Sequence, residues 1–138
     1  MPALEEILGF SNLWYPLALE TATPKALTSG MVIRLVAAPV FLATKLEAFF
    51  GRGNNDYLFS HDLGDFLAVI DGRDSLIDEC RASRAELRTY LRERVAGLLA
   101  TPAFIDALPG HLPGDAGSQS RLPDLEDKLR SLARLDKL

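Results

Sequence analysis

Apolar residues recur every three or four positions along several stretches of the chain, the spacing that places them on one face of a helix. This pattern predicts helices over about 39–50, 60–72, 83–100 and 123–135. Ser60 is a good N-cap for the second helix, because a serine oxygen accepts hydrogen bonds from first-turn N–H groups. The inward-facing positions are Phe41, Leu42, Leu46, Phe49 and Phe50; Leu63, Phe66, Leu67 and Ile70; Leu87, Leu91, Val95 and Leu98; and Leu125, Leu129 and Leu132.

Two shorter helices are predicted as well. One is a short helix within 9–22, where Pro16 suits a first turn better than a helix interior, and the other follows Thr101 through about residue 108. The Gly- and Asn-rich stretch 51–56 predicts a flexible turn, and the Pro- and Gly-rich stretch 109–114 predicts a loop.

One strand is predicted, over 31–36, because this run is β-branched and Pro39 ends it. One strand cannot form a sheet. We therefore expect it either to lie on the helices as an isolated extended segment or to pair with strands of another chain or of a missing upstream part. The expected fold class is α+β, mostly helical, in a single domain over 1–138.

Composition is that of one ordinary soluble domain: 138 residues, 48% hydrophobic and 25% charged, with a net charge of −4. The longest apolar stretches are interrupted by Arg34 or Pro39 well short of the ~20 residues of a membrane span. The acidic N-terminus does not resemble a signal peptide, so we expect a cytoplasmic protein. Cys80 with only two histidines cannot supply the four protein ligands of a structural zinc site.

Lys45 is a candidate functional residue, because its spacing places it on the buried stripe of the helix over 39–50. Two interpretations are open. The lysine reaches the edge of the core and meets a carboxylate such as Glu47 or Asp56, or it lies in a cleft as a fixed positive charge for phosphate.

Asp62 lies at the margin of the next helix's apolar stripe, where side chains line clefts, and Asp65 lies further out. Both are also placed to compensate the helix dipole. His61 is expected to be an exposed first-turn residue. Arg52, in the turn before this helix, is placed either to contact phosphate or to act as an ordinary connector residue.

A row of arginines at spacings of three and four forms a basic ridge on the helix over 83–100, suited to following an RNA backbone. The ridge contains Arg81, Arg84, Arg88 and Arg92. Acidic residues interleave with it, so an ordinary solvated face is the other interpretation. His111, in its Pro/Gly loop, is expected to be a surface residue.

Several motifs that mark common enzyme classes are absent from the sequence. The sequence contains no Walker loop, no Gly-x-Ser-x-Gly elbow, no His-Glu-x-x-His helix and no dinucleotide fingerprint. It also contains no acid pair at Asp-x-Asp spacing.

Residues 30–72 resemble the C-terminal half of the AbiEii-type nucleotidyltransferases, a family that contains toxins of bacterial toxin–antitoxin and phage-defence systems. The family pattern is a helix with Lys-Leu-x-Ala and an aromatic or aliphatic residue, an Arg shortly after, then Arg-Asp-x-x-Asp-Leu opening the next helix. Here the pattern is matched by Lys45-Leu46-Glu47-Ala48-Phe49, by Arg52 and by Asp62-Leu63-Gly64-Asp65-Phe66, with His61 where the family usually has Arg.

The resemblance implies a nucleotidyltransferase fold in which Lys45 and Asp62 are catalytic: Lys45 neutralises the triphosphate, and Asp62 orients it or the acceptor. Arg52 and Asp65 join Lys45 as nucleotide-binding residues. Magnesium with a nucleoside triphosphate is the implied cofactor of a full-length form, held by Asp-x-Asp carboxylates. The acceptor is open between tRNA, a protein or another molecule, and an antitoxin partner is open as well.

This chain departs from the family pattern, because it has neither the Asp-x-Asp pair nor a Gly-Ser element upstream of Lys45. We therefore expect a truncated product or a mis-assigned start that retains half a nucleotide site and is inactive alone. Two alternatives remain: a non-catalytic interaction module, as an oligomer or with a toxin–antitoxin-type partner, whose strand over 32–36 pairs with another subunit, or RNA binding through Arg84, Arg88 and Arg92.

Overall fold

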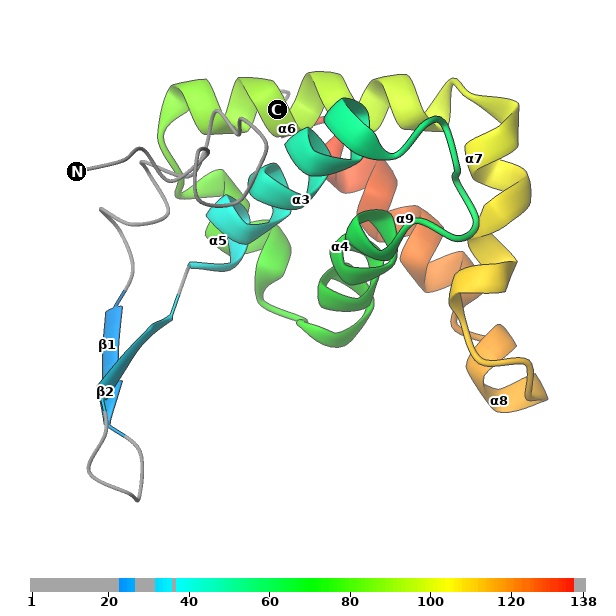
Figure 1. The fold of residues 1–138 in the computed structure, drawn as a ribbon, viewed down its shortest axis with the longest axis horizontal. Helices are drawn as coiled ribbons and strands as arrows, with labels where there is room; N and C mark the ends of the chain where they lie inside the picture. The colour runs from blue at the N-terminus through cyan, green and yellow to red at the C-terminus, as the bar shows by residue number, and fades with distance from the viewer. Residues whose placement is uncertain (1–22, 27–31, 36, 136–138) are drawn as a thin grey trace.

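A computed structural model describes residues 23–26, 32–35 and 37–135, and the described chain is mostly helical (Figure 1). The expected α+β class is therefore supported in its helical part, while a nucleotidyltransferase fold stays a proposal. The helix predicted over 9–22 lies outside the described residues. Among the helices described, none has the length and apolar character needed to cross a membrane.

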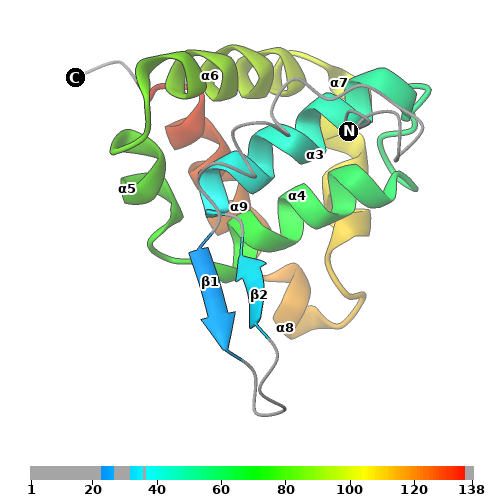
Figure 2. The ribbon, with the colours of Figure 1, turned by 60° about the vertical axis from the view of Figure 1, so that its left-hand side comes forward.

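Two helices form the centre of the fold. Helix α3 covers Ala38–Arg52, with proline in its first turn, and helix α4 covers His61–Gly72. The predicted cap of α4 is confirmed, because Ser60 Oγ accepts a hydrogen bond from Leu63 N at 3.2 Å. The two helices pack side by side (Figure 2), so that residues near the end of α3 come close to the start of α4.

The other helices surround this pair. They are α5 (Leu76–Arg81), α6 (Ala85–Leu99), α7 (Pro102–Ala107), the 3₁₀ helix η1 (Leu108–His111), α8 (Ala116–Gln119) and α9 (Leu122–Leu132). Helix α6 runs along one side of the bundle, and α9 packs against both α6 and α4. Helices α5 and α8 were not predicted, because elements of 6 and 4 residues are too short for periodicity to reveal. The predicted loop 109–114 begins inside η1.

One apolar core joins these helices. It contains the predicted stripes of α3, α4, α6 and α9 except for two residues of α3: Phe50, which is 42% exposed, and Phe41, which is partly buried and lies outside the core cluster. The core also takes in Leu76 and Cys80 from α5 and Phe104 from α7. The helical periodicity in the sequence therefore identified the buried faces of the long helices.

A two-stranded antiparallel hairpin precedes α3. Strand β1 covers Thr23–Ala26, and strand β2 covers Val32–Leu35, inside the stretch predicted as a strand. Thr23 pairs with Leu35 and Ala26 pairs with Val32. The expectation that the strand lacks a partner in its own chain is corrected: β1 supplies it, and its sequence Thr-Pro-Lys-Ala carries no strand signal. The hairpin projects away from the helices in both ribbon views.

Candidate functional site

Four residues singled out in the sequence meet where α3 packs against α4. Lys45 and Arg52 are seven residues apart on α3, about two turns, and so lie on the same face. Asp62 and Asp65 lie in the first and second turns of α4, three residues apart, and also share a face. We call these residues the α3–α4 charge cluster.

Asp62 is the centre of the α3–α4 charge cluster. Its carboxylate accepts two hydrogen bonds from Arg52, from Nε at 3.1 Å and from Nη2 at 3.2 Å. Lys45 Nζ lies 3.6 Å from Asp62 Oδ1 and 2.8 Å from Asp65 Oδ2. The Asp62 side chain is only 12% exposed, so these cations compensate a carboxylate that is largely withdrawn from water.

The environment of Lys45 keeps it charged. Burial alone lowers the pKa of Lys45, but the hydrogen bond and charge of Asp65, together with those of Asp62, outweigh burial and raise the pKa above its ordinary value. Two cations face two carboxylates, so the α3–α4 charge cluster has no net charge.

The partners expected for Lys45 from the sequence were wrong. Glu47 instead accepts a hydrogen bond from the Tyr90 hydroxyl of α6, and Asp56 accepts one from the backbone N–H of Phe59. The first interpretation, a core-edge lysine meeting a carboxylate, is correct in kind, with Asp62 and Asp65 as the partners.

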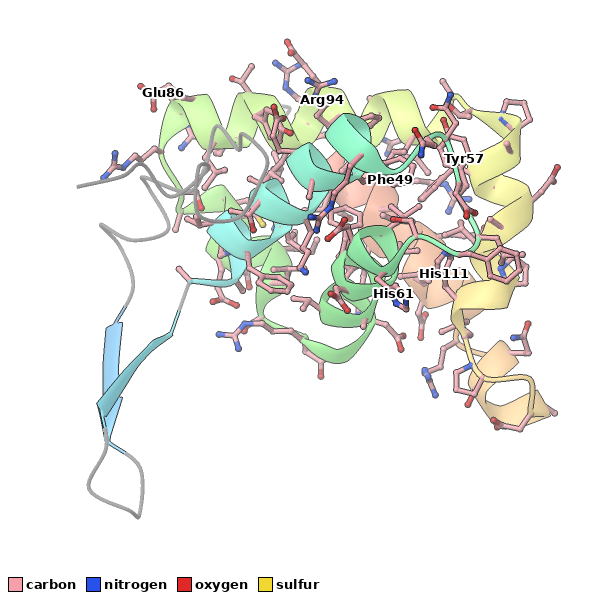
Figure 3. All side chains as sticks on the ribbon, viewed as in Figure 1. Phe49, Tyr57, His61, Glu86, Arg94 and His111 are labelled. Atoms are coloured by element: carbon pink, nitrogen blue, oxygen red, sulfur yellow. The ribbon has the colours of Figure 1, made fainter. Side chains whose placement is uncertain are left out.

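An open cleft of about 420 Å³ lies beside the α3–α4 charge cluster. Arg52 and Asp62 line one part of it, and the loop between α3 and α4 lines the rest. Phe59 and His61 also line the cleft, and both are exposed, as predicted for His61; Figure 3 shows His61 at the start of α4. The cleft therefore combines a cation, a carboxylate, an aromatic ring and an imidazole.

The loop that forms this cleft is held by local contacts. Gly53 ends α3, and a Cβ at this position would lie 2.5 Å from the carbonyl oxygen of Phe49. Asn54 and Asn55 then adopt positive φ angles of 50° and 60°, a conformation that asparagine tolerates better than most residues. Gly53, Asn54 and Asn55 are therefore suited to the backbone conformation that this loop adopts.

His111 is not the free surface residue expected from its loop. It is partly buried, and its Nε2 lies 2.7 Å from the carbonyl oxygen of Tyr57. Because a carbonyl oxygen only accepts, Nε2 carries the hydrogen in this contact. Tyr57 in turn packs against Phe49, with ring centroids 5.3 Å apart (Figure 3). His111 therefore ties η1 to the loop that lines the cleft.

The proposed arginine ridge is not uniformly exposed. Arg84 is exposed at the start of α6, while Arg88 and Arg92 are partly buried. Arg88 Nη1 donates to the carbonyl oxygen of Ser83, and Arg81 pairs with Asp78 on α5 at 3.2 Å. Arg88 and Arg92 are therefore less accessible than Arg84, and RNA binding through these arginines stays a prediction.

The residues of the site do not fit a magnesium centre held by this chain. Within the described ranges, His, Cys, Asp and Glu side chains form no group of three suited to a metal ion. Asp62 and Asp65 are already paired with cations, which compete directly with a metal for carboxylate oxygens. The magnesium implied by the resemblance therefore has no protein cage among these residues.

Sequence reasoning missed Phe59. The residue directly before an N-cap often packs its apolar side chain onto the fourth helical residue. For α4 that residue is Gly64, which has no side chain to receive the ring. A Phe at 59, a cap at Ser60 and a Gly at 64 together signal an exposed ring, and the Phe59 side chain is 76% exposed.

Comparison with known proteins gives no relative: no family model, no curated protein and no solved structure matches this chain.

Proposed function

We propose that this chain is a nucleotidyltransferase-like protein that binds the phosphates of a nucleoside triphosphate at the α3–α4 charge cluster and does not catalyse transfer alone. One observation carries the proposal: Lys45, Arg52, Asp62 and Asp65, selected from the sequence pattern, form one connected cluster beside a cleft. Lys45 and Asp65 are 20 residues apart in the sequence, and the packing of α3 against α4 brings their charged atoms to 2.8 Å.

Arg52 is the residue of the α3–α4 charge cluster that a phosphate contacts. Its side chain is 51% exposed and lines the cleft, so a ligand reaches it without unfolding the helix. A guanidinium holds phosphate and carboxylate oxygens in the same two-point geometry. A phosphate can therefore share or replace the contact with Asp62, while Lys45, with a side chain only 25% exposed, keeps Asp62 compensated.

Catalysis by the isolated chain is not part of the proposal. The sequence has no Asp-x-Asp pair, and the described carboxylates do not fit a magnesium cage. In-line attack on an α-phosphate needs the developing charge to be neutralised. What this chain's own residues supply is a cationic contact and a positioned carboxylate, which suit binding and orientation of the ligand.

The proposal is tested by calorimetric titration of the full chain with inorganic tripolyphosphate and with ATP plus magnesium. Arg52→Gln should weaken both affinities about tenfold or more, since a hydrogen bond to a charged group contributes roughly 1.5–3 kcal/mol. Arg121→Gln is the matched control, because Arg121 is 46% exposed and pairs with Asp71 at 3.2 Å, outside the cleft. No binding by the unaltered protein, or equal losses in both variants, would exclude the proposal.

A second candidate function rests on the hairpin. Within the described residues β2 pairs with β1 alone, so its other edge has no strand beside it. Exposed strand edges accept further strands. We propose as an alternative that β2 pairs with a strand of a second protein subunit. Sedimentation of the full chain over a wide concentration range tests self-association, and a strictly monomeric protein would count against this mode of assembly.

A further inference from the structure

We propose that Phe59 is a stacking platform for the base of the nucleotide, so that the 420 Å³ cleft binds a nucleoside as well as phosphate. This inference rests on the proposed function for the position of the phosphates. It adds a recognition element that phosphate contacts alone do not provide, and it names a purine nucleotide as the preferred class of ligand.

The exposure of Phe59 is the first argument. Four large apolar side chains of the described chain are substantially exposed, and Phe59 is the most exposed of them at 76%, against 42% for Phe50, 41% for Leu58 and 38% for Ile105. Phe50 lies against Arg94, whose guanidinium carbon is 4.8 Å from the ring centroid. Within the described part of the chain, no aromatic or cationic group covers the ring of Phe59 in this way.

The backbone on either side of the Phe59 ring is held in position by its neighbours. The Phe59 backbone N–H donates to Asp56 Oδ1 at 2.9 Å, and Ser60 N donates to the carbonyl oxygen of Asp56 at 3.2 Å. On the other side, Leu58 lies over Gly110, where an added Cβ would come within 2.4 Å of the leucine Cδ1. A binding platform with its backbone fixed in advance loses less entropy when a ligand arrives.

The absence of a side chain at position 64 is the third argument. A residue at the position of Phe59 usually packs onto the fourth residue of the helix, and in α4 that residue is Gly64. The nearest side-chain atom to a Cβ at Gly64 would be His111 Nδ1, at 3.7 Å. The usual apolar partner of Phe59 in the following helix is therefore missing, and Phe59 lines the cleft.

The cleft places this ring and the phosphate-binding group on one surface. Phe59, Arg52 and Asp62 all line it, and its volume falls within the range of about 300–1,000 Å³ typical of small-molecule sites. Asn54 and His61, also in the lining, carry donors and acceptors suited to a base edge or a ribose hydroxyl. Because a purine offers a larger π-face than a pyrimidine, stacking on Phe59 favours ATP or GTP over CTP or UTP.

The experiment compares the affinity of the full chain for ATP with that for inorganic tripolyphosphate, both with magnesium. Stacking on an aromatic residue contributes roughly 1–3 kcal/mol per base, equivalent to about fivefold to about 150-fold in affinity. We expect ATP to bind tighter than tripolyphosphate by a factor in this range. Phe59→Leu should remove that advantage and leave tripolyphosphate affinity unchanged, while Phe59→Tyr should retain it.

The control is Phe50→Leu, an exposed phenylalanine outside the cleft lining, which should leave both affinities unchanged. Equal binding of ATP and tripolyphosphate by the unaltered protein overturns this inference alone. Binding of neither ligand overturns the proposed function and this inference together. An ATP affinity that Phe59→Leu does not change, or a dimer that Phe59→Leu dissociates, shows that the ring serves another purpose and also overturns the inference.

Discussion

Arg52 and Asp62 form a two-point ion pair between the last turn of α3 and the first turn of α4, with N to O distances of 3.1 and 3.2 Å. The pair spans the loop that lines the cleft, so it fixes the loop ends relative to one another. Lys45 and Asp65 extend the pair along the same helix interface. The stability of this helix pair and the ligand binding that we propose therefore depend on the same side chains.

Replacing Asp62 should destabilise the fold more than replacing Asp65. Asp62→Asn removes the shared carboxylate of Lys45 and Arg52, and we expect a loss of about 1–2 kcal/mol in the free energy of unfolding. This is less than the roughly 3–5 kcal/mol typical of a fully buried pair, because Arg52 is half exposed. Asp65→Asn, at a side chain 53% exposed, should cost under about 1 kcal/mol. Urea denaturation of both variants checks the order, and the reverse order would contradict it.

Removing the cap of α4 should weaken the start of that helix. Ser60→Ala loses the hydrogen bond from Leu63 N, and we expect a loss of about 1 kcal/mol in the free energy of unfolding. Ser60→Asp is the matched control, because aspartate caps as well as serine does. Thermal unfolding followed by circular dichroism distinguishes the two, and equal losses in both variants would argue against capping as the cause.

Gly53 should not tolerate a side chain. Its added Cβ would lie 2.5 Å from the Phe49 carbonyl oxygen and 2.7 Å from a ring carbon of the same residue. Both groups belong to the packed end of α3, so we expect Gly53→Ala to cost about 1–3 kcal/mol, the usual range for overpacking. Gly72→Ala is the control, since the space around that Cβ is open. Urea denaturation of both variants tests this, and an unchanged Gly53→Ala midpoint would contradict it.

Cys80 should be unreactive in the folded protein. Burial raises the pKa of its thiol to about 12, with a further contribution from the charge of Glu79. At pH 8 a thiol-reactive disulfide should therefore modify the native protein far more slowly than the urea-unfolded protein. Rapid modification of the native protein, at a rate near that of the unfolded chain, would contradict the burial of this side chain.

The same shift makes stability depend on alkaline pH. The unfolded thiol loses its proton near pH 9.0, whereas the folded thiol keeps it up to about pH 12. Between these values the unfolded state binds fewer protons, so the free energy of unfolding falls as pH rises. Cys80→Ala should show a shallower fall over this window when urea unfolding is measured at successive pH values. Lys45, whose pKa is also raised in the folded state, contributes to the slope that remains.

The long helices could be predicted from the sequence because apolar spacing and capping residues are local features of the chain. Leu87, Leu91 and Val95 recur at helical spacing, and all are buried in α6. Ser60 caps α4 because the residue itself supplies the oxygen. Helix α5 escaped prediction because six residues contain too few apolar positions to show a period. The pairing of β2 with β1 escaped it because Pro24 and Lys25 do not favour a strand.

The same distinction between local sequence evidence and tertiary packing applies to the candidate site. The sequence by itself determined the four charged residues of the site, since the pattern from Lys45 to Asp65 marks them along the chain. Only the tertiary structure decided that Lys45 meets Asp62 and Asp65, that Glu47 turns to Tyr90 on α6, and that His111 bonds the carbonyl of Tyr57. Sequence spacing specifies the face of a helix on which a side chain lies, but the neighbour on that face depends on how the helices pack.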